Sequence, residues 1–166
     1  MAKEVERKFL VDSDQWRGGV KGVLYRQGYL VINTNFTIRV RVAGSHGYLT
    51  IKISASGITR LEYEYAIPLE DATELLDRLC KNPIIEKTRY RVQHSGMVWE
   101  VDEFHGDNNG LVLAEVELDD EHQEINLPKW VGKEVSAIPK FYNASLVDNP
   151  FSNWPDCERN EVLSNR

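Results

Sequence analysis

Most of the chain alternates between apolar and polar side chains in short segments. At residues 38–42, for example, the order is Ile-Arg-Val-Arg-Val. Because successive side chains of a strand point to opposite faces of a sheet, this period of two predicts strands with one apolar and one polar face. Such segments occur at residues 3–11, 23–31, 37–43, 48–54, 61–68, 85–94, 97–104 and 111–118. Turn-forming residues separate several of them, at 44–47, 95–96 and 106–110, so the pattern predicts a mainly β, antiparallel fold with enough strands to close a barrel.

One segment has the period of an amphipathic helix instead. Its apolar side chains are spaced by three and four residues: Ala72, Leu75, Leu76 and Leu79. Asp71, with Glu74 three positions later, predicts an acidic capping box at the start of this helix. We also expect a short helix or turn at residues 12–18 and another helix at residues 129–136. The amphipathic helix would cover one side of the sheet.

The length of 166 residues predicts a single domain with a substantial core. We place this domain at residues 1–147 and a C-terminal tail at residues 148–166, because turn-forming residues dominate the composition after Val147. Phe151 and Trp154 indicate that part of the tail docks on the domain, since large aromatic side chains stabilise a protein mainly when they are buried.

Composition is that of an ordinary globular protein, with 42% hydrophobic and 28% charged residues. The net charge of −6 argues against a nucleic-acid partner. No apolar segment is long enough to cross a membrane, and the N-terminus lacks the apolar run of a secretory signal. We therefore expect a cytoplasmic protein with neither a membrane nor a nucleic acid as partner.

The first predicted strand carries the clearest chemical signal. Glu4, Glu6 and Lys8 alternate with Val5, so two carboxylates and an ammonium group share one face. Carboxylate oxygens beside a cation suit a divalent metal ion and the phosphate chain that it carries. A solvated strand can also carry such a triplet, and only recurrence on other strands distinguishes the two interpretations.

The charged face does recur. On the other strands its members are Arg39 and Arg41; Lys52; Arg60, Glu62 and Glu64; Lys87, Arg89 and Arg91; Glu100 and Asp102; and Glu115 and Glu117. An ordinary sheet would expose this face to water and mix small polar residues into it. A barrel closed with this face inward would instead have a charged lumen, which needs water, ions and a polyanionic ligand to offset the cost of buried charge. Basic groups recognise phosphate oxygens, and carboxylates hold Mg²⁺ or Mn²⁺.

These residues, in this order, resemble the CYTH superfamily, the triphosphate tunnel metalloenzymes. The motifs that carry the resemblance are Glu4-x-Glu6-x-Lys8, Arg39-x-Arg41, Lys52, Arg60 with Glu62 and Glu64, Glu-Lys-Thr-Arg-Tyr at 86–90, Glu100-x-Asp102 and Glu115-x-Glu117. The similarity extends over about residues 3–146, and the compact form is most similar to short bacterial inorganic tripolyphosphatases. It implies an eight-stranded antiparallel β-barrel tunnel with a charged lumen and a few helices outside.

The resemblance also implies a role for each charged group. The triphosphate would be bound by Lys8, Arg39, Arg41, Lys52, Arg60, Lys87, Arg89 and Lys140. One or two Mg²⁺ or Mn²⁺ ions would be held by Glu4, Glu6, Glu64, Glu100, Asp102, Glu115 and Glu117. Lys8, Lys87 and Asp102 would act in catalysis, Asp102 by completing a second metal site or by orienting the attacking water.

The implied activity is metal-dependent hydrolysis of inorganic tripolyphosphate to pyrophosphate and phosphate. Two alternatives remain open: a class IV-type adenylyl cyclase, which converts ATP to cyclic AMP, and a noncatalytic barrel that binds polyphosphate or a nucleotide. Both Glu-x-Glu pairs are present, which favours an enzyme over a sensor. The expected partner is a small-molecule triphosphate, and the sequence leaves the choice between monomer and homodimer open.

Overall fold

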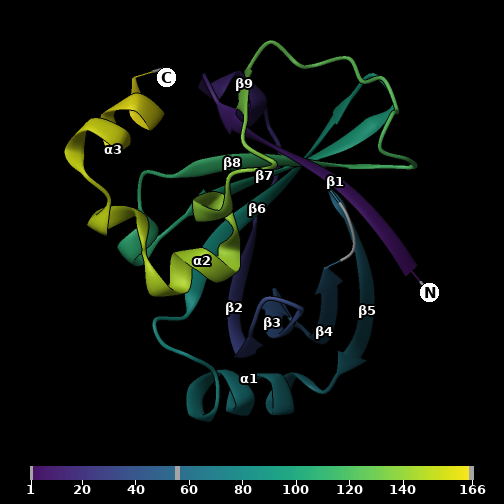
Figure 1. The fold of residues 1–166 in the computed structure, drawn as a ribbon, viewed down its shortest axis with the longest axis vertical. Helices are drawn as coiled ribbons and strands as arrows, with labels where there is room; N and C mark the ends of the chain where they lie inside the picture. The colour runs from purple at the N-terminus through teal and green to yellow at the C-terminus, as the bar shows by residue number, and fades with distance from the viewer. Residues whose placement is uncertain (1, 55–56, 165–166) are drawn as a thin grey trace.

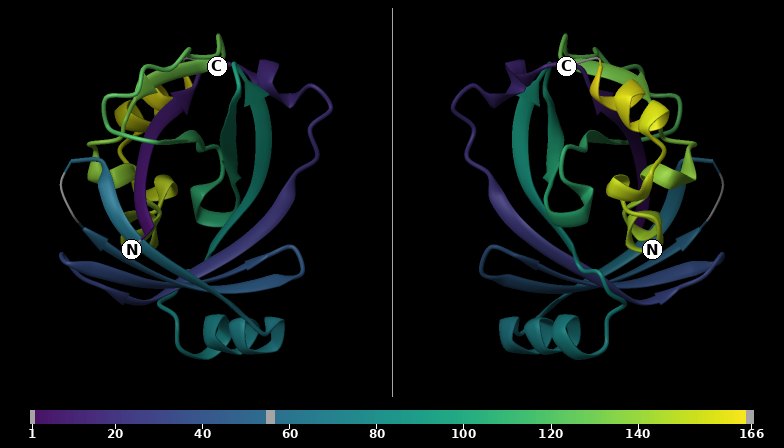
Figure 2. Two further views of the ribbon diagram at one scale, coloured as in Figure 1. Left: turned by 90° about the vertical axis from the view of Figure 1, so that its right-hand side faces the viewer. Right: turned by 90° about the vertical axis from the view of Figure 1, so that its left-hand side faces the viewer.

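The computed structural model describes residues 2–54 and 57–164 and contains one antiparallel sheet of nine strands (Figures 1 and 2). The strands are β1 (Ala2–Val11), β2 (Val23–Ile32), β3 (Phe36–Ala43), β4 (His46–Ser54), β5 (Thr59–Ile67), β6 (Ile85–His94), β7 (Met97–Phe104), β8 (Val112–Leu118) and β9 (Val131–Glu134). The first eight follow the order β5-β4-β3-β2-β6-β7-β8-β1, and pairing of β1 with β5 closes them into a barrel. The predicted eight-stranded antiparallel barrel is confirmed.

Helices lie outside the barrel strands. The α-helices are α1 (Leu69–Arg78), α2 (Asn143–Asp148) and α3 (Asp156–Leu163), and the 3-10 helices are η1 (Asp14–Arg17), η2 (Gly106–Asn108), η3 (Pro139–Phe141) and η4 (Phe151–Asn153). In the part of the chain that the structure describes, no helix combines the length and the apolar character that a membrane crossing requires.

Strand β1 closes the barrel because its two edges have different partners. On one edge, residues 5–10 pair with β8. On the other edge, residues 2–5 pair with β5, and Phe9 and Val11 pair with β9. The predicted helix at residues 129–136 is therefore wrong: this stretch supplies β9. Its pairing with β1 is reinforced by an ion pair of 2.6 Å between Arg7 and Glu134, a long-range interaction that local propensity does not reveal.

Helix α1 covers the outer face of β3 and β4, below them in Figure 1. Ala72 and Leu76 are buried there as predicted, and Gly47 is required because a Cβ atom at this position would lie 2.7 Å from Cβ of Ala72. The predicted capping box is wrong, since the helix begins after Pro68 and no side chain among the described residues donates or accepts a capping hydrogen bond there. Leu79 follows the last helical turn and is 66% exposed, so the apolar stripe ends at Leu76.

The inward face is charged in one half of the barrel and apolar in the other. Leu10, Ile85, Phe104 and Leu113 have the same strand parity as the charged residues but belong to a buried apolar cluster. The C-terminal segment supplies further members of that cluster: Val135, Phe141, Leu146, Val147, Phe151, Trp154 and Val162. Residues that follow 147 thus pack on the barrel, while the proposed domain boundary at 147 stays a prediction. The apolar half confines the polar site to the other half.

Candidate active site

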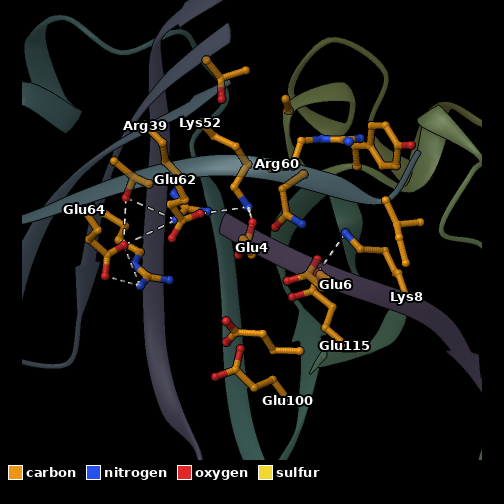
Figure 3. A pocket seen from close by; sticks show the side chains of 18 of the residues that line it. Glu4, Glu6, Lys8, Arg39, Lys52, Arg60, Glu62, Glu64, Glu100 and Glu115 are labelled. Atoms are coloured by element: carbon orange, nitrogen blue, oxygen red, sulfur yellow. Dashed lines mark hydrogen bonds and ion pairs between the residues drawn. The ribbon is translucent and has the colours of Figure 1, made fainter. Parts of the chain in front are cut away.

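A cavity of about 1030 Å³ occupies the charged half of the barrel (Figure 3). Strand pairing places its groups opposite one another: Lys8 faces Glu115 on β8, and Glu4 faces Arg60 on β5. Thirteen of the predicted site residues line it, namely Glu4, Glu6, Lys8, Arg39, Arg41, Lys52, Arg60, Glu64, Lys87, Arg89, Glu100, Glu115 and Glu117. The structure thus brings together groups from seven strands around one space.

Lys52 lies between two carboxylates at one side of the cavity. Its Nζ is 2.6 Å from Glu4 and 3.0 Å from Glu62. Burial alone would lower the pKa of Lys52, but the carboxylates of Glu6 and Glu4 outweigh it and raise that pKa. Burial would likewise raise the pKa of Glu62, and Lys52 and Arg39 bring it below its usual value. Glu62 belongs to the recurring charged face but was not predicted to bind metal or substrate.

Arg39 and Arg41 both approach Glu64, which also accepts a hydrogen bond from Thr50. Arg41 donates two hydrogen bonds to Glu64, of 3.0 and 3.1 Å, and Thr50 donates a third of 2.9 Å. Arg39 donates to Thr50 at 3.2 Å. The Nε atoms of both arginines are buried without a hydrogen-bond partner among the described residues. Unsatisfied cationic donors at a cavity wall suit an anionic ligand.

A buried ion network forms the base of the cavity. Asp102 accepts hydrogen bonds from Lys87 Nζ at 2.6 Å and from Arg89 Nε and one terminal nitrogen at 2.7 Å each. Glu115 lies 3.0 Å from Arg89 and 2.8 Å from Lys8 Nζ. Burial would raise the pKa values of both carboxyls, but the neighbouring cations hold them below their usual range, that of Glu115 well below.

Asp102 is predicted from the sequence as a metal ligand or water-orienting group, but it lies behind the cavity lining and is 1% exposed. Glu100, two positions earlier, does line the cavity, and its side chain is 29% exposed. Lys140 also lies outside the lining. Its Nζ is 2.9 Å from Glu158 and 4.6 Å from the ring centre of Trp154, so it ties α3 to η3.

Glu6 and Glu117 face each other across β1 and β8. Burial, assisted by the neighbouring Glu115 carboxylate, raises the pKa of Glu6 to about 7. Burial and Glu4 likewise raise the pKa of Glu117. Ionised carboxylates at these positions lack sufficient positive charge nearby, and a divalent cation would supply it.

The carboxylates therefore fit a hard divalent ion in chemistry and position. Nevertheless, within residues 2–54 and 57–164 no group of three acidic, histidine or cysteine side chains forms a ready-made metal site. The reason is visible in Figure 3: Glu4 pairs with Lys52, and Glu115 pairs with Lys8. Acids and bases of the cavity neutralise one another in this structure.

Uncharged groups that were not predicted from the sequence complete the site. Asn143 Oδ1 accepts hydrogen bonds from Lys87 Nζ at 2.9 Å and from Gln27 Nε2 at 3.1 Å. Tyr25 and Tyr48 line the same cavity. Period-two alternation places Gln27, Tyr25 and Tyr48 on the inward face, but nothing in the sequence connects Asn143, the first residue of α2, with a strand 56 positions earlier.

Comparisons with known proteins agree with this geometry. The family profile described as the CYTH domain matches residues 2–145. An inorganic triphosphatase of Acetivibrio thermocellus is 50% identical over 156 residues, which cover 94% of this chain and 100% of that protein. An inorganic triphosphatase of Nitrosomonas europaea is 36% identical over 148 residues, covering 87% and 96%. The crystal structure of the inorganic triphosphatase NE1496 superposes with a TM-score of 0.65 at 33% identity, over 89% of this chain and 95% of that one.

Proposed function

Because this chain belongs to the CYTH superfamily, the triphosphate tunnel metalloenzymes, we propose that it is a divalent-metal-dependent hydrolase of inorganic tripolyphosphate. The products would be pyrophosphate and phosphate. The observation that carries the proposal is the cavity enclosed by Lys8, Arg39, Arg41, Lys52, Lys87 and Arg89, all of which project from barrel strands. The two curated relatives that are named inorganic triphosphatases support the choice of substrate.

Charge balance in the cavity supports a combined role for metal and substrate. Its lining carries eight basic and eight acidic side chains, so the cavity has almost no net charge with which to attract a polyanion. A bound triphosphate would take over bases such as Lys8 and Lys52 from their carboxylate partners. Glu115 and Glu4 would then be free to hold divalent cations. A triphosphate bound alone would make the site negative, and the divalent cations would offset that charge.

We assign metal binding to Glu4, Glu6, Glu115 and Glu117, with Glu64 and Glu100 as further candidate ligands, and Mg²⁺ or Mn²⁺ as the ion. Once bound, such an ion neutralises phosphate oxygens and lowers the pKa of an attacking water. Lys8, Lys87 and Arg89 would orient the phosphate chain and stabilise charge on its oxygens. Asp102 would act through Lys87 and Arg89, which it fixes by three hydrogen bonds, rather than as a ligand.

The direct test measures phosphate and pyrophosphate released from tripolyphosphate and from ATP, with Mg²⁺ or Mn²⁺, by the wild-type protein and by Glu4→Ala. Metal-dependent cleavage of tripolyphosphate that is lost in Glu4→Ala would support the hydrolase. Formation of cyclic AMP from ATP would identify a cyclase instead. Binding of either compound without turnover would indicate a noncatalytic barrel.

We expect the apparent KM for tripolyphosphate to rise above pH 8. Burial lowers the pKa of Lys87 to about 8 despite the opposing charge of Asp102, so the ammonium group that faces the substrate loses its proton in this range. Kinetics between pH 7 and 9.5 would show this rise in KM. In Lys87→Met, KM should be high at every pH in this range and should not rise further. A wild-type KM that stays flat to pH 9.5 would contradict the assignment.

The same group has the opposite effect on stability. Lysine in an unfolded chain keeps its proton up to its ordinary pKa of 10.5, so between about pH 8 and that value the unfolded state binds more protons than the folded state. The contribution of Lys87 to the free energy of unfolding should therefore increase with pH while substrate affinity decreases. If affinity were lost through partial unfolding instead, the free energy of unfolding and the substrate affinity would both decrease as the pH rises.

We propose a cytoplasmic monomer or homodimer whose partner is a small-molecule triphosphate rather than a nucleic acid or a membrane. The net charge of −6 supports the exclusion of nucleic acid, because the surface as a whole repels polyanions while the cavity offers individual cations.

A further inference from the structure

Two tyrosines and two arginines form a row across four neighbouring strands at the wall of the cavity. In strand order they are Tyr48 on β4, Arg41 on β3, Tyr25 on β2 and Arg89 on β6. Arg41 Cζ lies 5.3 Å from the ring centre of Tyr48 and 5.4 Å from that of Tyr25, and Arg89 Cζ lies 5.2 Å from the Tyr25 ring. All three distances are within the range of cation–π attraction.

The strand register explains why Tyr25 reaches both arginines. Gln27 lies directly opposite Arg41 on β3, and Val23 lies directly opposite Arg89 on β6. Tyr25 is halfway between these two positions, so each arginine is its diagonal neighbour on one side. Diagonal neighbours across strands are within reach of long and aromatic side chains.

Tyrosines and carboxylates hold different parts of the guanidinium groups. The N–H donors lie in the guanidinium plane, and in this structure they point to Glu64 from Arg41 and to Asp102 and Glu115 from Arg89. A ring that attracts the cation does so over its π-face and uses none of those donors. A phosphate ligand competes with the carboxylates for the donors but leaves the aromatic contacts in place.

We propose that Tyr25 is a positioning residue that holds Arg41 and Arg89 ready for the triphosphate when these arginines exchange carboxylate oxygens for phosphate oxygens. The inference rests on the proposed function, since it needs a triphosphate in this cavity. Without the ring, both guanidinium groups would gain rotational freedom at the moment of ligand binding, and ordering them would weaken affinity. Tyr48 contacts only Arg41 of the two and has a smaller share in the effect.

The test compares Tyr25→Leu, which removes the π-face at similar bulk, with Tyr25→Phe, which keeps it. We expect Tyr25→Leu to raise KM for tripolyphosphate about tenfold and to lower kcat less than about threefold, because an interaction common to bound substrate and transition state changes KM. Tyr25→Phe should stay within about twofold of wild type, and Tyr48→Leu should raise KM about threefold. The matched control is Tyr65→Leu. Tyr65 lies on the outer face of β5 and is 54% exposed, so its replacement should change neither KM nor kcat.

A double-mutant cycle separates positioning from a purely structural role. If Tyr25 acts partly through Arg41, then Tyr25→Leu should raise KM less in an Arg41→Met background than in the wild type. Equal effects in both backgrounds, or a KM that changes only in proportion to lost thermal stability, would overturn the inference. If the wild type is active and Tyr25→Leu has the same KM, the positioning role alone is refuted. If the wild type does not hydrolyse tripolyphosphate, the proposed function is refuted.

Discussion

Glu6→Gln should abolish metal-dependent cleavage of tripolyphosphate while leaving the metal-free fold at least as stable as the wild type. The pKa of Glu6 is raised to about 7 by burial and by Glu115, so its ionised form is unfavourable until a cation arrives. Glutamine resembles the neutral form in shape and cannot ligate a metal ion as a carboxylate does. Activity should fall about 100-fold or more, because metal stabilisation of the transition state is worth several kcal/mol.

Thermal unfolding with and without Mg²⁺ or Mn²⁺ gives a readout that does not depend on activity. We expect metal to raise the melting temperature of the wild type and to have little effect on Glu6→Gln. Glu86→Gln is the matched control, because Glu86 lies on β6 outside the cavity lining with a side chain that is 48% exposed. A Glu6→Gln variant that keeps the metal-induced shift and the activity of wild type would remove Glu6 from the metal site.

The pH dependence of stability provides a second check on Glu6. A carboxyl whose folded pKa lies above its ordinary value of 4.5 binds its proton more tightly in the folded state. In the metal-free wild type this group contributes most to stability below pH 4.5, and its contribution decreases as the pH rises from there through about 7. The Glu6→Gln variant lacks this titration, so its melting temperature should decline less over that interval.

Strand alternation was sufficient to predict which charged groups point into the barrel. Side chains on one parity share a face, and closure of the barrel turns that whole face inward, so Glu6, Arg39 and Arg89 could be assigned without knowledge of any contact. Depth along the barrel could not be predicted in this way. Glu100 and Asp102 share a parity on β7, but only Glu100 lines the cavity, because Asp102 lies one step deeper among Lys87 and Arg89.

Long-range pairing explains the remaining differences. Strand β9 pairs with the part of the β1 edge that β5 does not cover. This partial edge arises only when the barrel closes. Lys140 was predicted to bind substrate, but it turns to Glu158 on α3, while its neighbour Asn143 reaches Lys87. The direction of each side chain in this segment depends on how the C-terminal residues pack in the apolar half, which the local sequence does not encode.

Arg39→Met should lower kcat/KM for tripolyphosphate about 100-fold to 1000-fold, since the loss of one fixed donor to a developing negative charge has effects of this size. The fold should survive the change. Glu64 keeps its hydrogen bonds from Arg41 and Thr50. The change also removes the Nε of Arg39, which is buried without a hydrogen-bond partner in the described part of the chain. We therefore expect a melting temperature equal to that of the wild type or slightly above it.

Arg91→Met is the matched control for Arg39→Met. Arg91 also lines the cavity, but its side chain is 68% exposed and approaches Glu100 only to 3.8 Å, so it should change kcat/KM less than about threefold. Steady-state kinetics and thermal unfolding of both variants decide the matter. If Arg39→Met retained more than a tenth of wild-type activity, the arginines of β3 would not be the triphosphate site. Equal losses in both variants would instead indicate that the barrel attracts its substrate by overall charge, without a defined position for each phosphate.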